Sequence, residues 1–267
     1  MLSQKYFYLH IPKTAGTTFN DFLERAFGAK ETIFHIESKI DKIHNQRVIA
    51  GHLQLPKAEK LIDEFENYIQ LTVLREPLKQ LSSHLRYVKK LGEPSEKKRL
   101  AGHTESIKRI VAFLQGIDFS KVEDLKVMIE WLEKENYILF HNCQTHYLLG
   151  SRFHVNQTQV DFAIKKLQAM KYVGITERLN DFMYLLGNEF EFTNTIGNKK
   201  LNVTTENYGL DIQNSNIVEV LEPLICYDKI IYEEAKKRFE KDFSLLGGTL
   251  VQKENYYFDK IKSIFKF

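Results

Sequence analysis

The sequence predicts an α/β fold in which a central parallel sheet is covered by helices on both faces, as in a three-layer sandwich. Short apolar runs alternate with segments of helical periodicity along most of the chain. Those runs end at proline, glycine or charged residues, which is typical of buried strands. No linker-like segment divides the 267 residues. We therefore expect one domain over residues 1–267, with a helical insertion at about 92–150 and a C-terminal extension at about 249–267.

The elements of the first half follow as strand, helix, strand, helix, strand and helix. We expect strands at residues 6–11, 48–50 and 68–74, and helices at 17–27, 57–65 and 77–91. Gly28 ends the first helix, and Pro56 and Pro77 each suit a first helical position.

The second half is mostly helical by its apolar periodicity. We expect helices within residues 104–149 and at 158–169, 179–187 and 228–243, with one further strand at 172–175.

Composition excludes several classes of protein. Hydrophobic residues make up 43% and charged residues 27%, which argues against wholesale disorder. Lys and Arg exceed Asp and Glu by only three, so we expect no nucleic-acid partner. No apolar run approaches the ~18 residues of a membrane span, and strand-like residues begin at Tyr6, too early for a signal peptide. These features and the two cysteines predict a reduced, cytoplasmic protein.

The segment HIPKTAGTT joins the first strand to the first helix. Gly16 permits close backbone approach to a ligand, and Thr17 or Thr18 can cap the helix, whose free amides attract an anion. Lys13 adds a full positive charge. We therefore predict a P-loop-like cradle for phosphate or sulfate; the alternative interpretation is a threonine-rich helix cap with an incidental lysine.

This cradle differs from a Walker A loop, in which a lysine directly follows the second glycine. The best strand also ends at Arg75 instead of an aspartate that could hold Mg²⁺. Both features disfavour a P-loop kinase or ATPase. No His or Cys spacing typical of metal ligands occurs, so we predict no metal site.

A second anion site is predicted in LREPLKQLSSHL. Arg75 offers a bidentate fork, and the hydroxyl of Ser83 lies under two helical turns further on. Alternatively, Arg75 pairs with Glu76 and Ser83 is a surface residue. Two anion sites beyond neighbouring strands suggest a nucleotide with two separated phosphates.

Several segments resemble the PAPS-dependent carbohydrate sulfotransferases of the Golgi type, nearest to the heparan and uronyl 2-O-sulfotransferase branch (PAPS is 3′-phosphoadenosine 5′-phosphosulfate). The resemblance spans about residues 6–243, and the lack of a membrane anchor suggests a bacterial member. The segments follow the family's order: HIPKTAGTT, LREPLKQLSSHL, HNCQTHYLLG, KYVGITERLNDFMYLL, LNVT and YDKIIYEEAKKRF.

The resemblance implies specific roles for these residues. Arg75 and Ser83 would hold the 3′-phosphate of PAPS, and Thr204, after Asn202, would close over the nucleotide. The 5′-phosphosulfate would be held by Lys13, Thr14, Ala15, Gly16, Thr17 and Thr18.

His52 follows a short strand and is the predicted general base, because an imidazole pKa near ~6.5 suits removal of a hydroxyl proton. The 2-O-sulfotransferase branch has His-Gly-His here, and this chain has Ala50-Gly51-His52. The resemblance therefore does not extend to the uronic-acid specificity of that branch. The alternative interpretation is a strand-end histidine with a structural hydrogen bond.

Together these features predict transfer of a sulfuryl group from PAPS to a hydroxyl of a carbohydrate or glycoconjugate, with Lys13 stabilising the leaving oxygen. Residues 86–109 carry eight Lys and Arg against three Glu, which suggests an anionic glycan as acceptor; a solvated loop is the alternative. Two other functions stay open: a P-loop-like nucleotide kinase or phosphotransferase, and a non-catalytic nucleotide- or glycan-binding protein.

Overall fold

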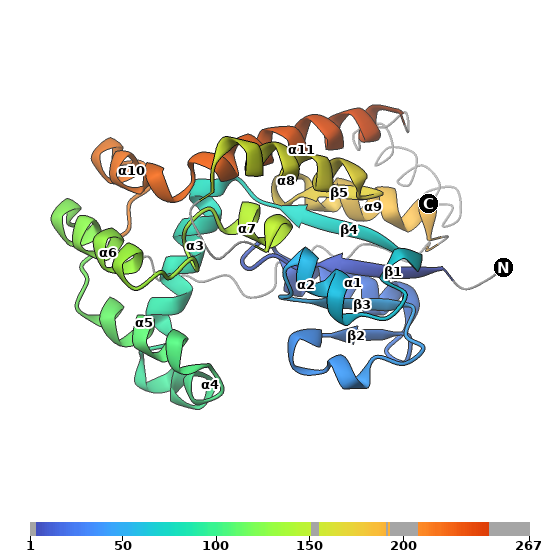
Figure 1. Ribbon diagram of the computed structural model, residues 1–267, viewed down its shortest axis with the longest axis horizontal. Coiled ribbons are helices and arrows are strands. Elements are labelled where there is room, and N and C mark those ends of the chain that lie inside the picture. Colours follow the sequence, from blue (N-terminus) through green and yellow to red (C-terminus); the bar gives the residue numbers. More distant parts are fainter. Residues whose placement is uncertain (1–3, 151–154, 191, 193–207, 246–267) are drawn as a thin grey trace, which may run out of the picture.

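The computed structural model describes residues 4–150, 155–190, 192 and 208–245. Five strands form one all-parallel sheet in the order β2-β3-β1-β4-β5, so the predicted α/β fold is confirmed (Figure 1). The strands are Lys5–Leu9 (β1), Thr32–Phe34 (β2), Val48–Gly51 (β3), Tyr68–Leu74 (β4) and Tyr172–Ile175 (β5).

The central strand β1 is buried and pairs with β3 on one side and β4 on the other. In the register, Leu9 stands beside Gly51 and Thr72. Because all three strands run in the same direction, their carboxyl ends reach the same edge of the sheet. The segments that follow β1, β3 and β4 therefore start side by side.

Helices cover both faces of the sheet. Tyr8 of β1 meets Phe19 of α1 on one face, and Phe7 meets Phe65 on the other. The helices around the sheet are α1 (Gly16–Phe27), α2 (Leu55–Leu61), α3 (Pro77–Lys90), α7 (Cys143–Leu149), α8 (Gln157–Ala169), α9 (Leu179–Glu189) and α11 (Cys226–Leu245).

A second group of helices has its own hydrophobic core beyond the sheet (Figure 1). The second half of α3 reaches into this core with Leu85 and Val88. We call this group the helical lobe; it comprises α4 (Lys97–Ala101), α5 (Glu105–Gln115), α6 (Val122–Lys134) and α10 (Ser215–Leu221). Because α10 belongs to it, the lobe also contains residues that lie outside the predicted insertion at about 92–150.

Most expected elements lie within two residues of their predicted ends, but one expected helix ends early and two elements were not expected. The edge strand β2 and helix α10 were not expected; β2 has only three half-buried residues and so lacks a clear apolar pattern. The helix expected at 57–65 ends at Leu61, since Ile62 is extended and Glu64 is left-handed. Among the helices described, none is long and apolar enough to cross a bilayer.

Candidate anion-binding site and base

The sheet edge brings the predicted anion sites together. The Nη1 atom of Arg75, beyond β4, donates a hydrogen bond of 3.0 Å to the carbonyl oxygen of Lys13, beyond β1. These residues are 62 positions apart in the sequence. The guanidinium therefore borders the loop that carries the predicted cradle.

The loop before α1 has the backbone shape of an anion-binding nest. Lys13 and Ala15 have positive φ angles of 66° and 64°, and Thr14 between them does not. Such alternation turns successive amide groups toward one point. The buried Thr14 hydroxyl donates 2.9 Å to the carbonyl of Ile11 and so fixes the turn.

The start of α1 differs from the prediction in one respect. Ala15 occupies the N-cap in the left-handed conformation, and no side chain caps the helix. Thr17 and Thr18 lie inside the first turn, so the expectation that either would cap the helix was wrong: the nest turns the chain too early for them. No acidic residue occupies this turn, which leaves the helix end attractive to an anion.

Gly16 also has a packing reason that the sequence does not reveal. A Cβ atom at this position would lie 1.6 Å from Nε2 of His10, whose ring is buried. The glycine therefore makes room for an imidazole that packs against the start of α1.

Lys13 sits in a strongly positive environment. Its Nζ lies 4.3 Å from the ring centre of Tyr87 on α3. Burial, followed by the charges of Arg75, Arg99 and Arg86, lowers the pKa of Lys13 to about 8. An anion bound among these groups would favour the protonated amine.

One face of α3 borders the loop. Gln80, which is buried, donates 2.9 Å to the carbonyl of Pro12, and Tyr87 contacts Lys13. Ser83 lies between these two residues on the same helical stripe. It is half-buried, and its role in binding a phosphate stays a prediction.

The backbone of Arg75 is held by a residue that the sequence analysis did not single out. The buried side chain of Gln144 accepts a hydrogen bond of 2.9 Å from the Arg75 amide. It also donates a hydrogen bond of 2.8 Å to the Arg75 carbonyl. Gln144 lies in the segment HNCQTHYLLG. The part of this segment in the family resemblance was the signal in the sequence that could have pointed to Gln144.

The first turn of α7, which carries Gln144, is capped from α11. Asp228 accepts hydrogen bonds from the amides of Gln144 (3.1 Å) and Thr145 (2.7 Å) and from the Thr145 hydroxyl (2.7 Å). Burial raises the pKa of Asp228 to about 6, although these hydrogen bonds oppose the rise.

His52, the predicted base, lies beyond β3 next to the nest. Its Nδ1 atom is 2.8 Å from the carbonyl oxygen of His10, and the two rings are 4.1 Å apart at their centres. A carbonyl oxygen only accepts, so Nδ1 carries the proton of the neutral ring and Nε2 keeps a lone pair. Burial lowers the pKa of His52, opposed by this hydrogen bond and by Glu37. The ring is neutral near pH 7 and suited to accept a proton.

His84 follows Ser83 and is fully buried against Phe140. Burial, with smaller effects of Lys13 and His52, lowers its pKa to about 3. A ring held neutral in this way fills space behind the site.

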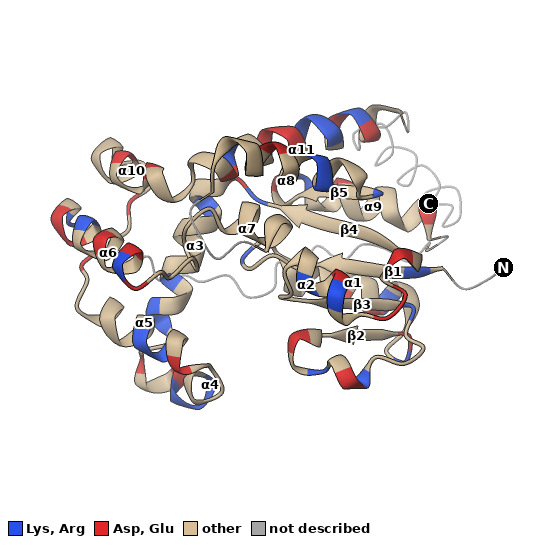
Figure 2. Cartoon of the chain, in the orientation of Figure 1, with Lys and Arg blue, Asp and Glu red and all other residues tan. Residues whose placement is uncertain are grey.

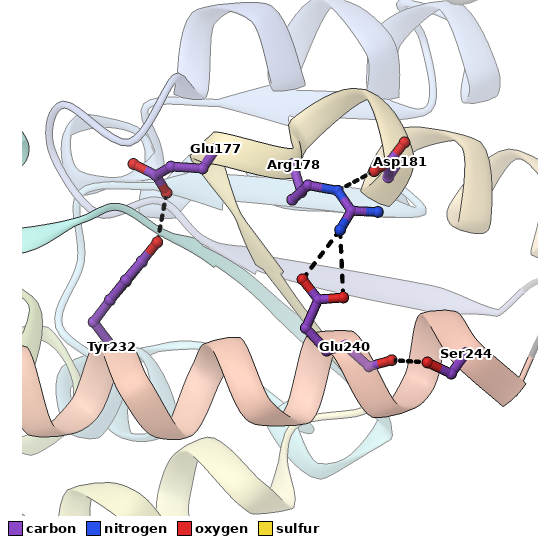
Figure 3. A network of polar contacts seen from close by, with 6 residues as sticks. All are labelled: Glu177, Arg178, Asp181, Tyr232, Glu240 and Ser244. Atoms are coloured by element: carbon purple, nitrogen blue, oxygen red, sulfur yellow. Dashed lines mark hydrogen bonds and ion pairs between the residues drawn. The ribbon is translucent and has the colours of Figure 1, made fainter. Parts of the chain in front are cut away.

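The segment KYVGITERLNDFMYLL makes polar contacts with α11 (Figure 3). Arg178 bonds Asp181 and reaches Glu240 of α11 at 3.1 and 3.3 Å. Glu177 accepts 3.0 Å from the Tyr232 hydroxyl and 3.1 Å from the Glu76 amide. These contacts tie β5 and the start of α3 to α11.

Several basic residues of the stretch 86–109 form ion pairs with nearby glutamates. Figure 2 shows Lys and Arg positions along the ribbon of α4 and α5. Lys108 pairs with Glu105 at 2.7 Å and Arg109 with Glu135 at 2.9 Å. Arg99 also pairs with Glu96, at 3.0 Å, yet it is among the charges that act on Lys13. Arg99 is thus the residue of α4 whose charge lowers the pKa of Lys13.

No protein-family model matches this chain, and no curated protein matches its sequence. The segment LNVT, with Thr204, and the C-terminal extension lie outside the described residues. Their predicted roles stay predictions.

Proposed function

We propose that the chain is a PAPS-dependent O-sulfotransferase that acts on a hydroxyl of a carbohydrate or glycoconjugate. One observation carries the proposal: Arg75 bonds the Lys13 carbonyl, and His52 bonds the His10 carbonyl at the start of the same loop. Two cationic sites at one sheet edge suit the two separated anionic ends of PAPS, and the imidazole suits an acceptor hydroxyl.

The roles of the residues follow from their chemistry. Nε2 of His52 takes the proton of the acceptor hydroxyl as its oxygen bonds to sulfur. The bond from sulfur to the bridging oxygen breaks, and adenosine 3′,5′-bisphosphate leaves. Lys13 and the amides of the nest stabilise the charge that grows on that oxygen. Arg75 and Ser83 bind the 3′-phosphate.

An anionic acceptor is supported by the side chains of α4. Lys97 and Lys98 are exposed, and Arg99 acts on Lys13. Reversing Lys97 and Lys98 to Glu should raise the acceptor KM and leave nucleotide affinity unchanged. Lys236 and Lys241, on α11 across the molecule, provide the matched double reversal (Figure 1). An unchanged acceptor KM would remove the idea.

The test of the cofactor is titration calorimetry. Adenosine 3′,5′-bisphosphate should bind without Mg²⁺ and more tightly than ADP or ATP. His52→Ala should keep that affinity but lose transfer of labelled sulfate from PAPS to a panel of glycans and small hydroxyl compounds.

A kinase or phosphotransferase is the second candidate, because the same nest and helix end suit the phosphates of ATP. Tighter binding of ATP with Mg²⁺ would favour it. Binding of the bisphosphate with no turnover on any acceptor would favour a non-catalytic binding protein.

A further inference from the structure

A carboxylate lies beside the proposed base. The Oε2 atom of Glu37 accepts a 2.9 Å hydrogen bond from the backbone amide of His52. Its Oε1 atom lies 3.4 Å from Nδ1 of His35. One carboxylate therefore contacts both the base residue and a neighbouring imidazole.

Two features of the chain place this carboxylate. Glu37 lies in a short 3-10 helix, Ile36–Ser38, directly after the edge strand β2, and the buried Ile36 anchors that turn. A Cβ atom at Gly51 would lie 2.4 Å from Oε2 of Glu37 and 2.9 Å from the Ile36 amide nitrogen. Glycine at position 51 is thus what lets the carboxylate reach the amide of the next residue.

The charges around His52 differ in sign. Lys13 from the nest and His35 from the loop after β2 disfavour a positive charge on the His52 ring, whereas Glu37 favours it. His10, packed on the ring from the end of β1, and His84 from α3 are held neutral by burial. Burial raises the pKa of Glu37, but hydrogen bonds from His35 and the backbone, with the charge of His52, hold it at about 2. Glu37 is therefore ionised throughout the neutral range.

We propose that Glu37 is a positioning residue for His52: it fixes the Gly51–His52 peptide and stabilises the imidazolium that forms when the ring takes a proton. Its part in turnover rests on the proposed function. Its effect on the charge of the His52 ring concerns the ligand-free protein and is independent of the proposed function.

The decisive variant is Glu37→Gln, which keeps an oxygen to accept from the His52 amide and removes the charge. NMR titration of the His52 ring in the ligand-free protein should show its pKa fall by about half a unit to one unit. In turnover, kcat should fall several-fold near pH 7, with its acid limb at lower pH and the affinity for adenosine 3′,5′-bisphosphate unchanged. Glu66→Gln, at an exposed site, is the matched control and should change neither.

Glu37→Ala separates the two effects, because it removes the hydrogen bond as well as the charge. It should lower kcat further than Glu37→Gln. An unchanged His52 titration in a folded Glu37→Gln protein would overturn the proposal. If neither the parent nor the variants transfer sulfate, the proposed function fails, and the NMR titration still decides what Glu37 does to His52.

Discussion

At the scale of single residues, Lys13 shows how a side chain gains its properties from distant parts of the chain. Its amine is partly withdrawn from water and lies among Arg75, Arg86 and Arg99. Repulsion among these cations is unfavourable until an anion lies between them. The same groups that disfavour the charge in the empty site therefore favour binding of a polyanion.

This environment predicts a pH-dependent affinity. The pKa of Lys13 is about 8 in the ligand-free protein, and a bound anion raises it. Affinity for adenosine 3′,5′-bisphosphate should thus be steady from about pH 7 to pH 8 and fall by up to about tenfold per pH unit above that. Calorimetry between pH 7 and 9.5 measures it. Lys13→Met should bind weakly at every pH, and a slope that persists in this variant would assign the effect to another group.

Gly16 gives a second prediction at this scale. In Gly16→Ala, the new methyl group would overlap the His10 ring, which must move together with its contact to His52. We expect a loss of stability of about 1–3 kcal/mol, measured by urea unfolding. Gly116→Ala is the control, because its Cβ would have no neighbour closer than 3.7 Å. Equal stability of both variants would contradict the packing described.

At the scale of elements, the short helix α7 connects α11 to the end of β4. Asp228 of α11 fixes the first turn of α7, and Gln144 in that turn grips both backbone polar groups of Arg75. The direction of the Arg75 side chain thus depends on three elements that are distant in sequence.

Loss of the two hydrogen bonds between Gln144 and the Arg75 backbone should lower both the stability of the fold and the affinity for the nucleotide. Gln144→Leu leaves the amide and carbonyl of Arg75 without their partner, which costs about 1–3 kcal/mol. Nucleotide affinity should fall too, because Arg75 loses its fixed backbone. Chemical unfolding and calorimetry measure the two effects. Gln168→Leu on the exposed side of α8 should lie within about 0.5 kcal/mol of the parent protein, and the same result for Gln144→Leu would show that the grip is dispensable.

At the scale of the whole molecule, helix α3 connects the sheet edge to the second hydrophobic core. The sheet core orders the nest, the base and Arg75, and the helical lobe has a core of its own. One side of α3 contacts the loop before α1 through Gln80, and its apolar side chains Leu81, Leu85 and Val88 pack into the lobe. Helix α4, with its basic residues, belongs to the same lobe through Leu100.

Phe182 joins the layers of the sheet core. Its buried ring contacts Phe19 of α1 and Phe239 of α11 and covers Gly174 of β5. Phe182→Ala should therefore cost about 3–5 kcal/mol in chemical unfolding. Phe162→Ala is the same change at a side chain that is 50% exposed, and we expect a loss below about 1 kcal/mol there. A similar cost at both positions would argue against this packing.

The order of most elements and the loop after the first strand could be predicted from the sequence. Strong local signals carried these predictions: the apolar run at 68–74, Pro77 at a helix start and Gly28 at a helix end. The edge strand β2 was not predicted, because its three half-buried residues show no alternation of apolar and polar positions.

Only the tertiary structure decided which polar groups meet. Glu37 reaches His52 through a turn after β2, and Gln144 reaches Arg75 from α7. Hydrophobic periodicity depends on neighbours within a few residues, and it contains no term for contacts between segments 15 or 69 positions apart. The pairing of β2 with β3 brings Glu37 to His52, and the packing of α7 at the end of β4 brings Gln144 to Arg75.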